Sequence, residues 1–284
     1  MVDWMALFAN DEQAIISFSW IMILSGVVTT NALCCGFKAT YGRYGEESIF
    51  AKFTVPARIA WFVQELPSLA VPIYALIINS NNLYPVNLAV LMLFIGHYIQ
   101  RTLIYPFLIK GGKPSPIHVV FMAFSFCAFN GYLQGFYHAK YASYDKNHLG
   151  SFASLTGLAL FFVGMFINIH SDHILRNLRK PGETGYKIPR GGMFEYVSAA
   201  NFFGEIVEWI GFALFAQTTP ASAFAFFTIC NIGPRAVQHH HWYHSKFEDY
   251  PAKRRALIPI CFKIGANSPL SISLYFIAPM KSNL

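Results

Sequence analysis

Seven stretches of this chain are apolar over about 20 residues, the length of helix that crosses a bilayer of about 30 Å. Inside hydrocarbon every main-chain N–H and C=O needs a partner in the protein, and a single segment meets that need only as an α-helix. Hydrophobic residues make up 55% of the chain and charged residues only 12%. We therefore predict an all-α membrane protein, a bundle of about seven transmembrane helices. The expected spans are residues 14–37, 54–78, 83–109, 117–138, 149–170, 197–217 and 221–237.

The basic residues of the connections indicate the orientation of this bundle, because Lys and Arg are retained on the cytosolic side. With the N-terminus in the lumen, the outer connections hold only Lys140 and Lys146, whereas the inner ones and the tail hold most of the others. The C-terminus is therefore expected in the cytosol. The net charge of +7 follows from this topology and suits anionic headgroups or a phosphorylated ligand. No basic domain is present, so a nucleic-acid partner is not indicated.

The cysteines and histidines give little sign of a metal site or a disulfide framework. No Cys-x-x-Cys occurs among the five cysteines. The run His239-His-His241 lies in a predicted helix, where successive side chains point about 100° apart and cannot all bind one ion. We expect a single membrane domain without a bound metal, and no feature indicates an obligate protein partner.

Polar side chains interrupt the second and third expected spans. Arg58 and Glu65 lie two turns apart on one face of a helix. We expect both to face the bundle interior, because ionisable groups inside a membrane usually serve a site or pair with another helix. His97 and Arg101 form an i, i+4 pair in the third span, with Tyr98 on the same turn. The charge on Arg101 argues against exposure of this turn to lipid.

The fifth span ends in an amide and an acid that share one helix face, Asn168 and Asp172. The chain then continues into Arg176 and Arg179. An amide and a carboxylate beside guanidinium groups can bind a ribose or a nicotinamide amide next to a phosphate. The following loop, residues 171–196, is rich in turn signals and basic side chains, which suits phosphate binding or simply a cytosolic loop.

The sixth span carries a second polar stripe, formed by Asn201, Glu205 and Glu208. Two carboxylates in one membrane helix indicate either a functional site or a buried structural network. No Gly-x-Gly-x-x-Gly follows a predicted strand, so a dinucleotide site of the Rossmann type is excluded.

Several dispersed motifs occur in one order along the chain. They are Gln64-Glu65, His97-Tyr98-x-x-Arg101, Asn168-Ile-His-Ser-Asp172, Leu178-Arg-Lys-Pro-Gly182, Tyr196-Val-Ser-x-Ala-Asn201-Phe-x-Gly-Glu205, Phe247-Glu-Asp-Tyr-Pro251 and Leu257-Ile-Pro259. In this order they resemble the membrane-embedded steroid 5α-reductases, from about residue 50 to residue 262. The resemblance implies a seven-helix enzyme of the endoplasmic reticulum that uses NADPH to reduce the 4,5 double bond of a 3-oxo-4-ene steroid.

The same resemblance implies a division of the chain. Residues 1–262 would form the reductase domain, with NADPH bound inside the cytosolic half of the bundle, chiefly by residues 115–262, and closed over by cytosolic loops. Relatives tend to end near the Leu257-Ile-Pro259 motif, so residues 263–284 form an extension of unknown role.

The resemblance also implies roles for individual residues. Glu65 and Tyr98 would donate hydrogen bonds to the C3 oxygen of the steroid, where negative charge develops when hydride reaches C5. Glu65 must be protonated to donate, and a close Arg58 would oppose that. The sequence does not identify the donor of the proton taken up at C4. The residues implied to line the NADPH pocket are Asn168, Asp172, Arg179, Tyr186, Asn201, Glu205, Arg235, His240 and Tyr243.

Three other functions share part of this pattern. A polyprenol reductase or a trans-2-enoyl-CoA reductase would use the same hydride donor with a flexible substrate. A membrane methyltransferase would need an adenosylmethionine pocket in the C-terminal helices, but would not need Glu65 near Tyr98. A non-enzymatic sterol-binding protein would need only an apolar cavity and leaves the polar stripes unexplained. We therefore expect a steroid 5α-reductase, acting on substrates such as testosterone or progesterone.

Overall fold

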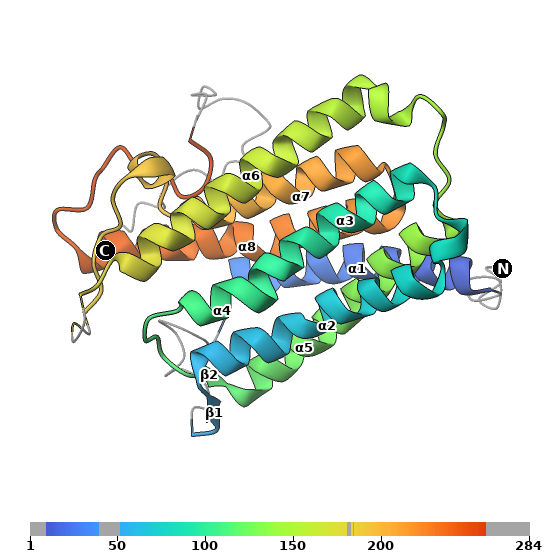
Figure 1. Cartoon of the computed structure of the whole chain (residues 1–284). Helices are drawn as coiled ribbons and strands as arrows, with labels where there is room; N and C mark the ends of the chain where they lie inside the picture. Colours follow the sequence, from blue (N-terminus) through green and yellow to red (C-terminus); the bar gives the residue numbers. More distant parts are fainter. Residues whose placement is uncertain (1–9, 40–51, 181–182, 184, 260–284) are drawn as a thin grey trace.

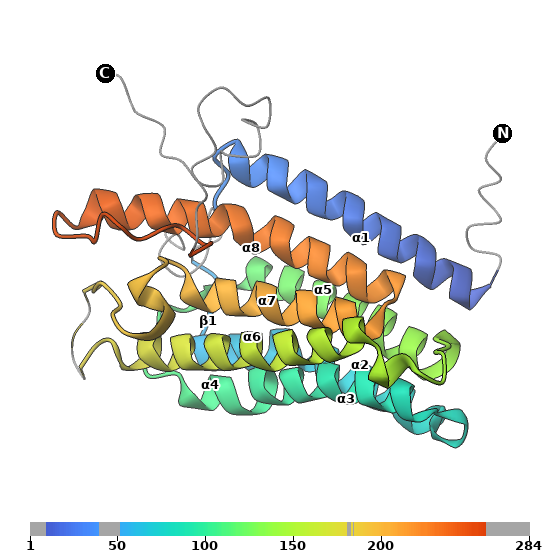
Figure 2. The ribbon, with the colours of Figure 1, turned by 90° about the horizontal axis from the view of Figure 1, so that it is seen from above.

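A computed structural model describes residues 10–39, 52–180, 183 and 185–259. The extension 263–284, Cys261 and the turn residues Pro181 and Gly182 lie outside the described residues. Within the described part, helices dominate, and strands β1 (Thr54–Val55) and β2 (Ser115–Pro116) form a two-stranded antiparallel ladder. The long helices run roughly side by side with alternating directions (Figures 1 and 2).

Among the described residues, five helical segments are long and apolar enough to cross a membrane. They are α1 (Asp11–Cys34), α2 (Ala57–Ile78), the continuous segment Pro85–Leu108, the segment Ile117–Tyr141 and α6 (Phe152–Asn177). These helices confirm the all-α membrane class and match the first five expected spans. Short 3-10 turns lie at Ser80–Asn82, His148–Gly150 and Gly192–Glu195.

The last two expected spans fold as helices that are not among these five. Helix α7 (Ala200–Ala216) has 17 residues and so extends about 25 Å, less than the hydrocarbon thickness. Helix α8 (Thr219–Lys246) has 28 residues and continues well past the expected end at residue 237. The apolar pattern ends there because residues such as His239 and His244 follow, but the helical hydrogen bonding continues.

A wider helical turn divides the third segment into α3 (Pro85–Ile99), the π-helical turn η4 (Gln100–Ile104) and α4 (Tyr105–Leu108). Pro106 has no N–H and cannot bond the carbonyl four residues before it. Instead, the Tyr105 N–H bonds the Gln100 carbonyl five residues back. Helix α5 (Ile117–Phe136) ends in a similar π-turn, Tyr137–Tyr141. Arg101 therefore lies in an irregular turn, a place where functional side chains are often found.

Helices α6 and α7 touch along a seam of glycines, Gly157 and Gly164 on α6 and Gly204 and Gly211 on α7. A Cβ at Gly157 would lie 2.7 Å from the Gly211 carbonyl oxygen, and one at Gly204 would lie 2.8 Å from the Gly164 carbonyl oxygen. Side chains at these positions would push the main chains apart. Small residues allow membrane helices to approach this closely. The seam brings the start of α7 against the end of α6.

The remaining helices complete the bundle by pairwise packing. Helix α2 packs on α5, where a Cβ at Gly131 would lie 2.9 Å from the Pro67 carbonyl oxygen. Helix α1 lies at the edge of the bundle and packs mainly on α8 (Figure 2). An aromatic core joins α3, α7 and α8, with the Trp209 ring 5.8 Å from Phe94 and 4.4 Å from Phe224.

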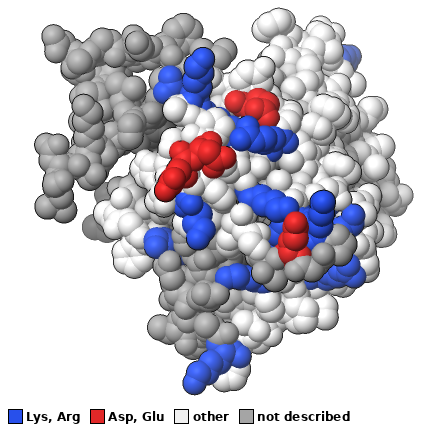
Figure 3. All heavy atoms as spheres, turned by 90° about the vertical axis from the view of Figure 1, so that its left-hand side faces the viewer, with Lys and Arg blue, Asp and Glu red and all other residues white. Residues whose placement is uncertain are grey.

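The loop 109–116, the described residues of the loop 178–199 and the segment 247–259 lie at one end of the bundle, which we call the basic end (Figure 1). Lys and Arg gather there, with Asp and Glu among them (Figure 3). The turn at Gly191 and Gly192 has φ values of 91° and 52°, which favour glycine and confirm the turn expected from the sequence. Arg254, 2% exposed, donates to the Pro189 carbonyl at 2.8 Å and pairs with Glu195 at 3.6 Å. It therefore fastens the chain after α8 to the loop before α7.

Candidate active site

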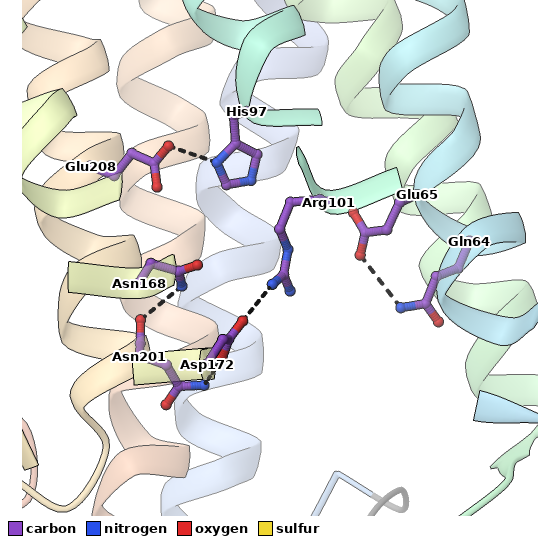
Figure 4. A network of polar contacts seen from close by, with 8 residues as sticks. All are labelled: Gln64, Glu65, His97, Arg101, Asn168, Asp172, Asn201 and Glu208. Carbon is purple, nitrogen blue, oxygen red and sulfur yellow. Dashed lines mark hydrogen bonds and ion pairs between the residues drawn. The ribbon is translucent and has the colours of Figure 1, made fainter. Parts of the chain in front are cut away.

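Four side chains in the bundle interior form a central polar cluster, Arg101, Asn168, Asp172 and Asn201. Arg101 Nη1 lies 3.0 Å from Asp172 Oδ2, and Asn201 Nδ2 donates to Asp172 Oδ1 at 3.3 Å. Asn168 Nδ2 donates to the Asn201 main-chain oxygen at 3.0 Å. Three helical segments supply these groups, η4, α6 and α7 (Figure 4). The pairing of Asn168 and Asp172 on one helix face is confirmed.

The fold explains why these residues meet. Gly204 has no side chain, and a Cβ there would lie only 2.5 Å from the Asn168 main-chain nitrogen. The beginning of α7 can therefore contact α6 directly. Arg101 reaches the cluster from η4, and its guanidinium stacks over the Trp61 and Tyr105 rings at 4.8 and 4.6 Å. Arg101 is only 8% exposed, and the two rings together with the Asp172 carboxylate offset the cost of burying its charge.

A second buried pair joins α3 to α7. His97 Nδ1 lies 2.7 Å from Glu208 Oε1, and Glu208 is completely buried. The other carboxylate oxygen, Oε2, makes no hydrogen bond with any described residue. Glu205, half-buried one turn before Glu208, has Arg101, His97 and Glu208 as its electrostatic neighbours. The stripe of Asn201, Glu205 and Glu208 therefore faces the interior, as the sequence predicts.

Glu65 and Tyr98 also face the interior, from α2 and α3. Glu65 accepts from Gln64 Nε2 at 3.4 Å and from Cys127 Sγ at 3.8 Å. Tyr98 is 4% exposed and has Cys127 and Glu65 as electrostatic neighbours. In Figure 4, Glu65 projects from α2 on one side and the residues of α6 and α7 from the other, with Arg101 and His97 between them.

The prediction that Arg58 faces the interior is wrong. This residue lies in the first turn of α2, where it is exposed, and its Nε donates to the Ile109 carbonyl at 2.9 Å. The helix period places Arg58 on the Glu65 face, but the first turn of α2 lies at the basic end of the bundle, where a guanidinium can reach solvent.

The other predicted cofactor residues lie nearer the basic end. Arg235 is buried over the Phe202 ring at 5.1 Å, and the Tyr186 ring contacts Trp242 at 4.9 Å. Arg179 is exposed just beyond α6. The nine predicted pocket residues thus fall in two groups. Asn168, Asp172, Asn201 and Glu205 belong to the central polar cluster or lie beside it, and the other five lie on α8 or in the connection between α6 and α7.

The second group includes a short hydrogen-bonded chain that sequence reasoning missed. Ser198 Oγ lies 2.6 Å from His240 Nδ1 and 2.6 Å from the Tyr250 hydroxyl, whose ring stacks on Tyr243 at 5.2 Å. Burial, followed by the nearby charges of His244, His241 and Arg255, lowers the pKa of His240 from 6.5 to about 4. A neutral His240 can accept from Ser198 or donate to it, depending on its tautomer, and the Ser198 and Tyr250 hydroxyls share the next hydrogen bond.

Glu195 in the loop before α7 is held by main-chain and cationic partners. The Gly191 N–H donates to Glu195 Oε1 at 2.5 Å. This bond and the charges of Arg254 and Arg190 lower the pKa of Glu195. Residues 191–195 of the loop before α7 are therefore held to one another and to the chain after α8.

Comparison with known proteins relates this arrangement to one family. The sequence model of 3-oxo-5-alpha-steroid 4-dehydrogenase matches residues 113–262. The chain is 55% identical to 3-oxo-5-alpha-steroid 4-dehydrogenase 1 of Bos taurus over 224 residues, 77% of this chain and 86% of that protein. It is 56% identical to the type 1 protein of Rattus norvegicus, with 77% and 85% covered, and 50% identical to the type 2 protein of Sus scrofa, with 78% and 87% covered.

The chain belongs to the 3-oxo-5-alpha-steroid 4-dehydrogenase family. The matched part of this family member begins just before β2 and contains α5 to α8 with the two groups of predicted cofactor residues. Glu65, Tyr98 and Arg101 precede that part. In the described residues of the family member, no group of three or more His, Cys, Asp or Glu side chains could hold a metal ion.

The site residues to which sequence reasoning assigned no role carried uneven signals. Arg101 and His97 stood out as charged residues in an apolar span, but their partners on α6 and α7 could not be paired from spacing. Ser198 and Tyr250 lie within two of the quoted motifs, but only the hydrogen bonds that join Ser198 to Tyr250 and to His240 indicate what these two residues do.

Proposed function

We propose that this protein is an NADPH-dependent steroid 5α-reductase that reduces the 4,5 double bond of 3-oxo-4-ene steroids such as testosterone or progesterone. The proposal rests on sequence identity: more than half of the aligned residues, over most of the chain, are identical to those of proteins named 3-oxo-5-alpha-steroid 4-dehydrogenase 1. The buried carboxylates, amides and phenol of the interior supply the groups that such a reaction needs.

The residues present fit a nicotinamide nucleotide. Amide and carboxylate groups of Asn168, Asp172, Asn201 and Glu205 match the hydrogen-bonding groups of a nicotinamide amide and a ribose. Arg176 adds a guanidinium whose Nη1 is buried and makes no hydrogen bond with the described residues, so an acceptor is missing there. The residues that would hold the rest of the nucleotide are Arg179, Tyr186, Arg235, His240 and Tyr243. When bound, NADPH supplies the hydride for C5.

Glu65 and Tyr98 are proposed to bind the steroid C3 oxygen. As C5 is reduced, negative charge develops on that oxygen, and two donors fixed beside it stabilise the transition state more than the ground state. Tyr98 is buried in the bundle interior, which supports this role because its side chain needs little reorganisation. Arg58 is engaged with the Ile109 carbonyl, so its charge is not set against a protonated Glu65.

We further propose that α7 and α8 lie in the bilayer, which gives seven helices, with the N-terminus in the lumen of the endoplasmic reticulum and the basic end in the cytosol. The glycine seam holds α7 against α6 at main-chain contact, and α8 packs along α1. Both partners are long enough to span.

The proposal is tested with purified protein in detergent, NADPH and testosterone or progesterone, with the 5α-reduced product measured by mass spectrometry. We expect product from the parent protein and a loss of at least about a hundredfold in kcat for Glu65→Gln and Tyr98→Phe, the usual effect of weakening or removing one donor to a developing oxyanion. Asn201→Ala should instead weaken NADPH binding roughly tenfold, as for one lost hydrogen bond to a buried group.

Matched controls are Glu248→Gln and Asn177→Ala, which change exposed residues and should leave both quantities unaltered. NADPH binding without steroid reduction would redirect the assignment to a polyprenol or enoyl-CoA substrate. Steroid binding without NADPH binding would indicate a sterol-binding protein instead.

A further inference from the structure

Helix α1 ends in two adjacent cysteines that are both exposed, Cys34 and Cys35. The other two cysteines of the described residues, Cys127 and Cys230, are buried. Free cysteine is among the most frequently buried residue types, so two neighbouring exposed thiols at the end of a helix need a reason.

The two thiols continue the outward face of α1. Trp20, Leu24 and Val28, spaced four residues apart, are 57%, 64% and 69% exposed, as expected for side chains that face lipid. Cys35 lies seven residues after Val28, and Cys34 seven after the exposed Val27, which is a rotation of only about 20° in each case. Both sulfur atoms therefore lie over the lipid-facing side of the helix.

The same end of α1 lies at the membrane surface. A helix of 24 residues extends about 36 Å, more than the hydrocarbon thickness, so its last turn reaches the headgroups. The helix stops at Gly36, which has a φ of 96°, and the Phe37 N–H returns to the Ala32 carbonyl at 3.2 Å. The exposed Phe37 follows, then Lys38, a sequence typical of a cytosolic membrane border.

Gln238 of α8 holds this end in place. Its Nε2 lies 3.0 Å from the Leu33 carbonyl and 2.8 Å from the Phe37 carbonyl, the residues on either side of the cysteines. The thiols are thus presented on the outside of a fixed turn, because the inner side of that turn is occupied by α8.

We propose that Cys34 and Cys35 are S-acylated by a long-chain fatty acid. The inference rests on the proposed orientation, which puts this end in the cytosol, where acyl-CoA is present. In each transfer the cysteine sulfur attacks the acyl-CoA thioester carbonyl and forms a new carbon–sulfur bond. The bond to coenzyme A breaks, the coenzyme A thiolate leaves with the electron pair, and it takes up the proton that the cysteine loses. No group is oxidised or reduced. Cysteines beside a membrane helix are the usual sites of this modification.

The acyl chains would lie in the cytosolic leaflet along Val28 and Leu24. Since α1 packs mainly on α8, they would add a second attachment for the end of a peripheral helix.

The test uses the full chain expressed in cultured cells. Free thiols are blocked, thioesters are cleaved with hydroxylamine, and a polyethylene-glycol maleimide is added to each thiol released. We expect two gel-shift steps for the parent chain and one for either Cys34→Ser or Cys35→Ser. The double variant should show none and keep its reductase activity in the same membranes. Cys230→Ser, a change at a buried cysteine, is the matched control and should keep both steps.

Three results would overturn the proposal. The parent chain could show no hydroxylamine-dependent shift. The shift could survive in the double variant and disappear with Cys261→Ser. A reductant alone could release the blocked thiols, which would show a disulfide instead of a thioester.

Discussion

Arg101 is the cation on which the central polar cluster depends. It is buried, pairs with Asp172 at 3.0 Å and stacks on two rings. Replacement by Met would leave the Asp172 carboxylate buried and without its cation, and loss of one partner of a buried pair costs about 3–5 kcal/mol. We expect Arg101→Met to lower the thermal midpoint of the protein in detergent. Arg101→Lys should lower it less, because the charge remains while the planar stacking is lost.

Lys140→Met is the matched control for this prediction. Lys140 lies 3.7 Å from Asp11 in an exposed pair, which contributes little to stability because water screens the two charges. Equal decreases in the thermal midpoint of Arg101→Met and Lys140→Met would show that the buried Arg101–Asp172 pair contributes no more to stability than an exposed pair.

His240 should make stability depend on pH. Its pKa of about 4 in the fold lies below the ordinary value of 6.5, because burial disfavours the imidazolium. As pH falls from 6.5 towards 4, the unfolded chain takes up the proton first, so the fold loses stability over that interval and is favoured above it. We expect the thermal midpoint to fall less on acidification in His240→Gln than in the parent. His241→Gln, at an exposed neighbour, should behave like the parent; a parent slope retained in His240→Gln would contradict the assignment.

Spacing along one helix was enough to predict which residues share a face, but not which residues meet across helices. Asn168 with Asp172, and Asn201 with Glu208, follow from 3.6 residues per turn. Which residues of α6 and α7 meet Arg101 and His97 depends on how far along each other these two helices pack, and for Arg101 also on the π-turn η4 in which it lies. Arg58 shows the opposite failure, since periodicity carries no information on how far along the bundle a residue lies.

The glycine seam between α6 and α7 is the contact between helices that should tolerate substitution least. A Cβ at Gly164 would overlap the main-chain nitrogen of Glu208 and lie 2.6 Å from the Gly204 carbonyl oxygen. Because both obstacles are main chain, Gly164→Ala must separate the helices, and overpacking of this kind costs about 1–3 kcal/mol. We expect a lower thermal midpoint and weaker NADPH binding, since Asn168 and Asn201 lie on either side of the seam.

Gly96→Ala provides the comparison for that variant. Gly96 is also helical, but a Cβ there meets nothing within 4 Å. Alanine is the better helix former by about 1 kcal/mol, so stability should be unchanged or slightly raised. A fall equal to that of Gly164→Ala would mean that the seam itself is not the cause.

The end of a helix was predictable where hydropathy and hydrogen bonding end together, as for α2 at Ile78. It was not predictable in α6 and α8, which continue past the expected ends at residues 170 and 237 to Asn177 and Lys246, after the apolar pattern has ended. The missing N–H of Pro106 predicts a disturbed helix at the turn before it. The sequence does not indicate whether the helix kinks, ends or widens there.

The orientation of the whole bundle can be tested in sealed microsomes. With Cys34, Cys35 and Cys261 replaced by Ser, the remaining Cys127 and Cys230 are buried, and a new cysteine at Lys253 or at Lys146, both exposed, reports its side of the membrane. We expect a membrane-impermeant maleimide to label Lys253→Cys directly and Lys146→Cys only after detergent is added, because basic segments stay in the cytosol. The reverse pattern would invert the proposed topology.

Helix α3 is the only one of the described helices that supplies residues to both sides of the proposed reaction centre. Its Tyr98 faces Glu65, while its His97, with Arg101 in the turn that follows, holds α7 and α6. Substitutions in α2 and α5 could therefore change the substrate side during evolution without disturbing α6 and α7, which pack through the glycine seam and carry the predicted nucleotide residues of the central polar cluster. On this view the family could diversify its substrates by varying one pair of helices while α3 and the other pair are inherited nearly unchanged.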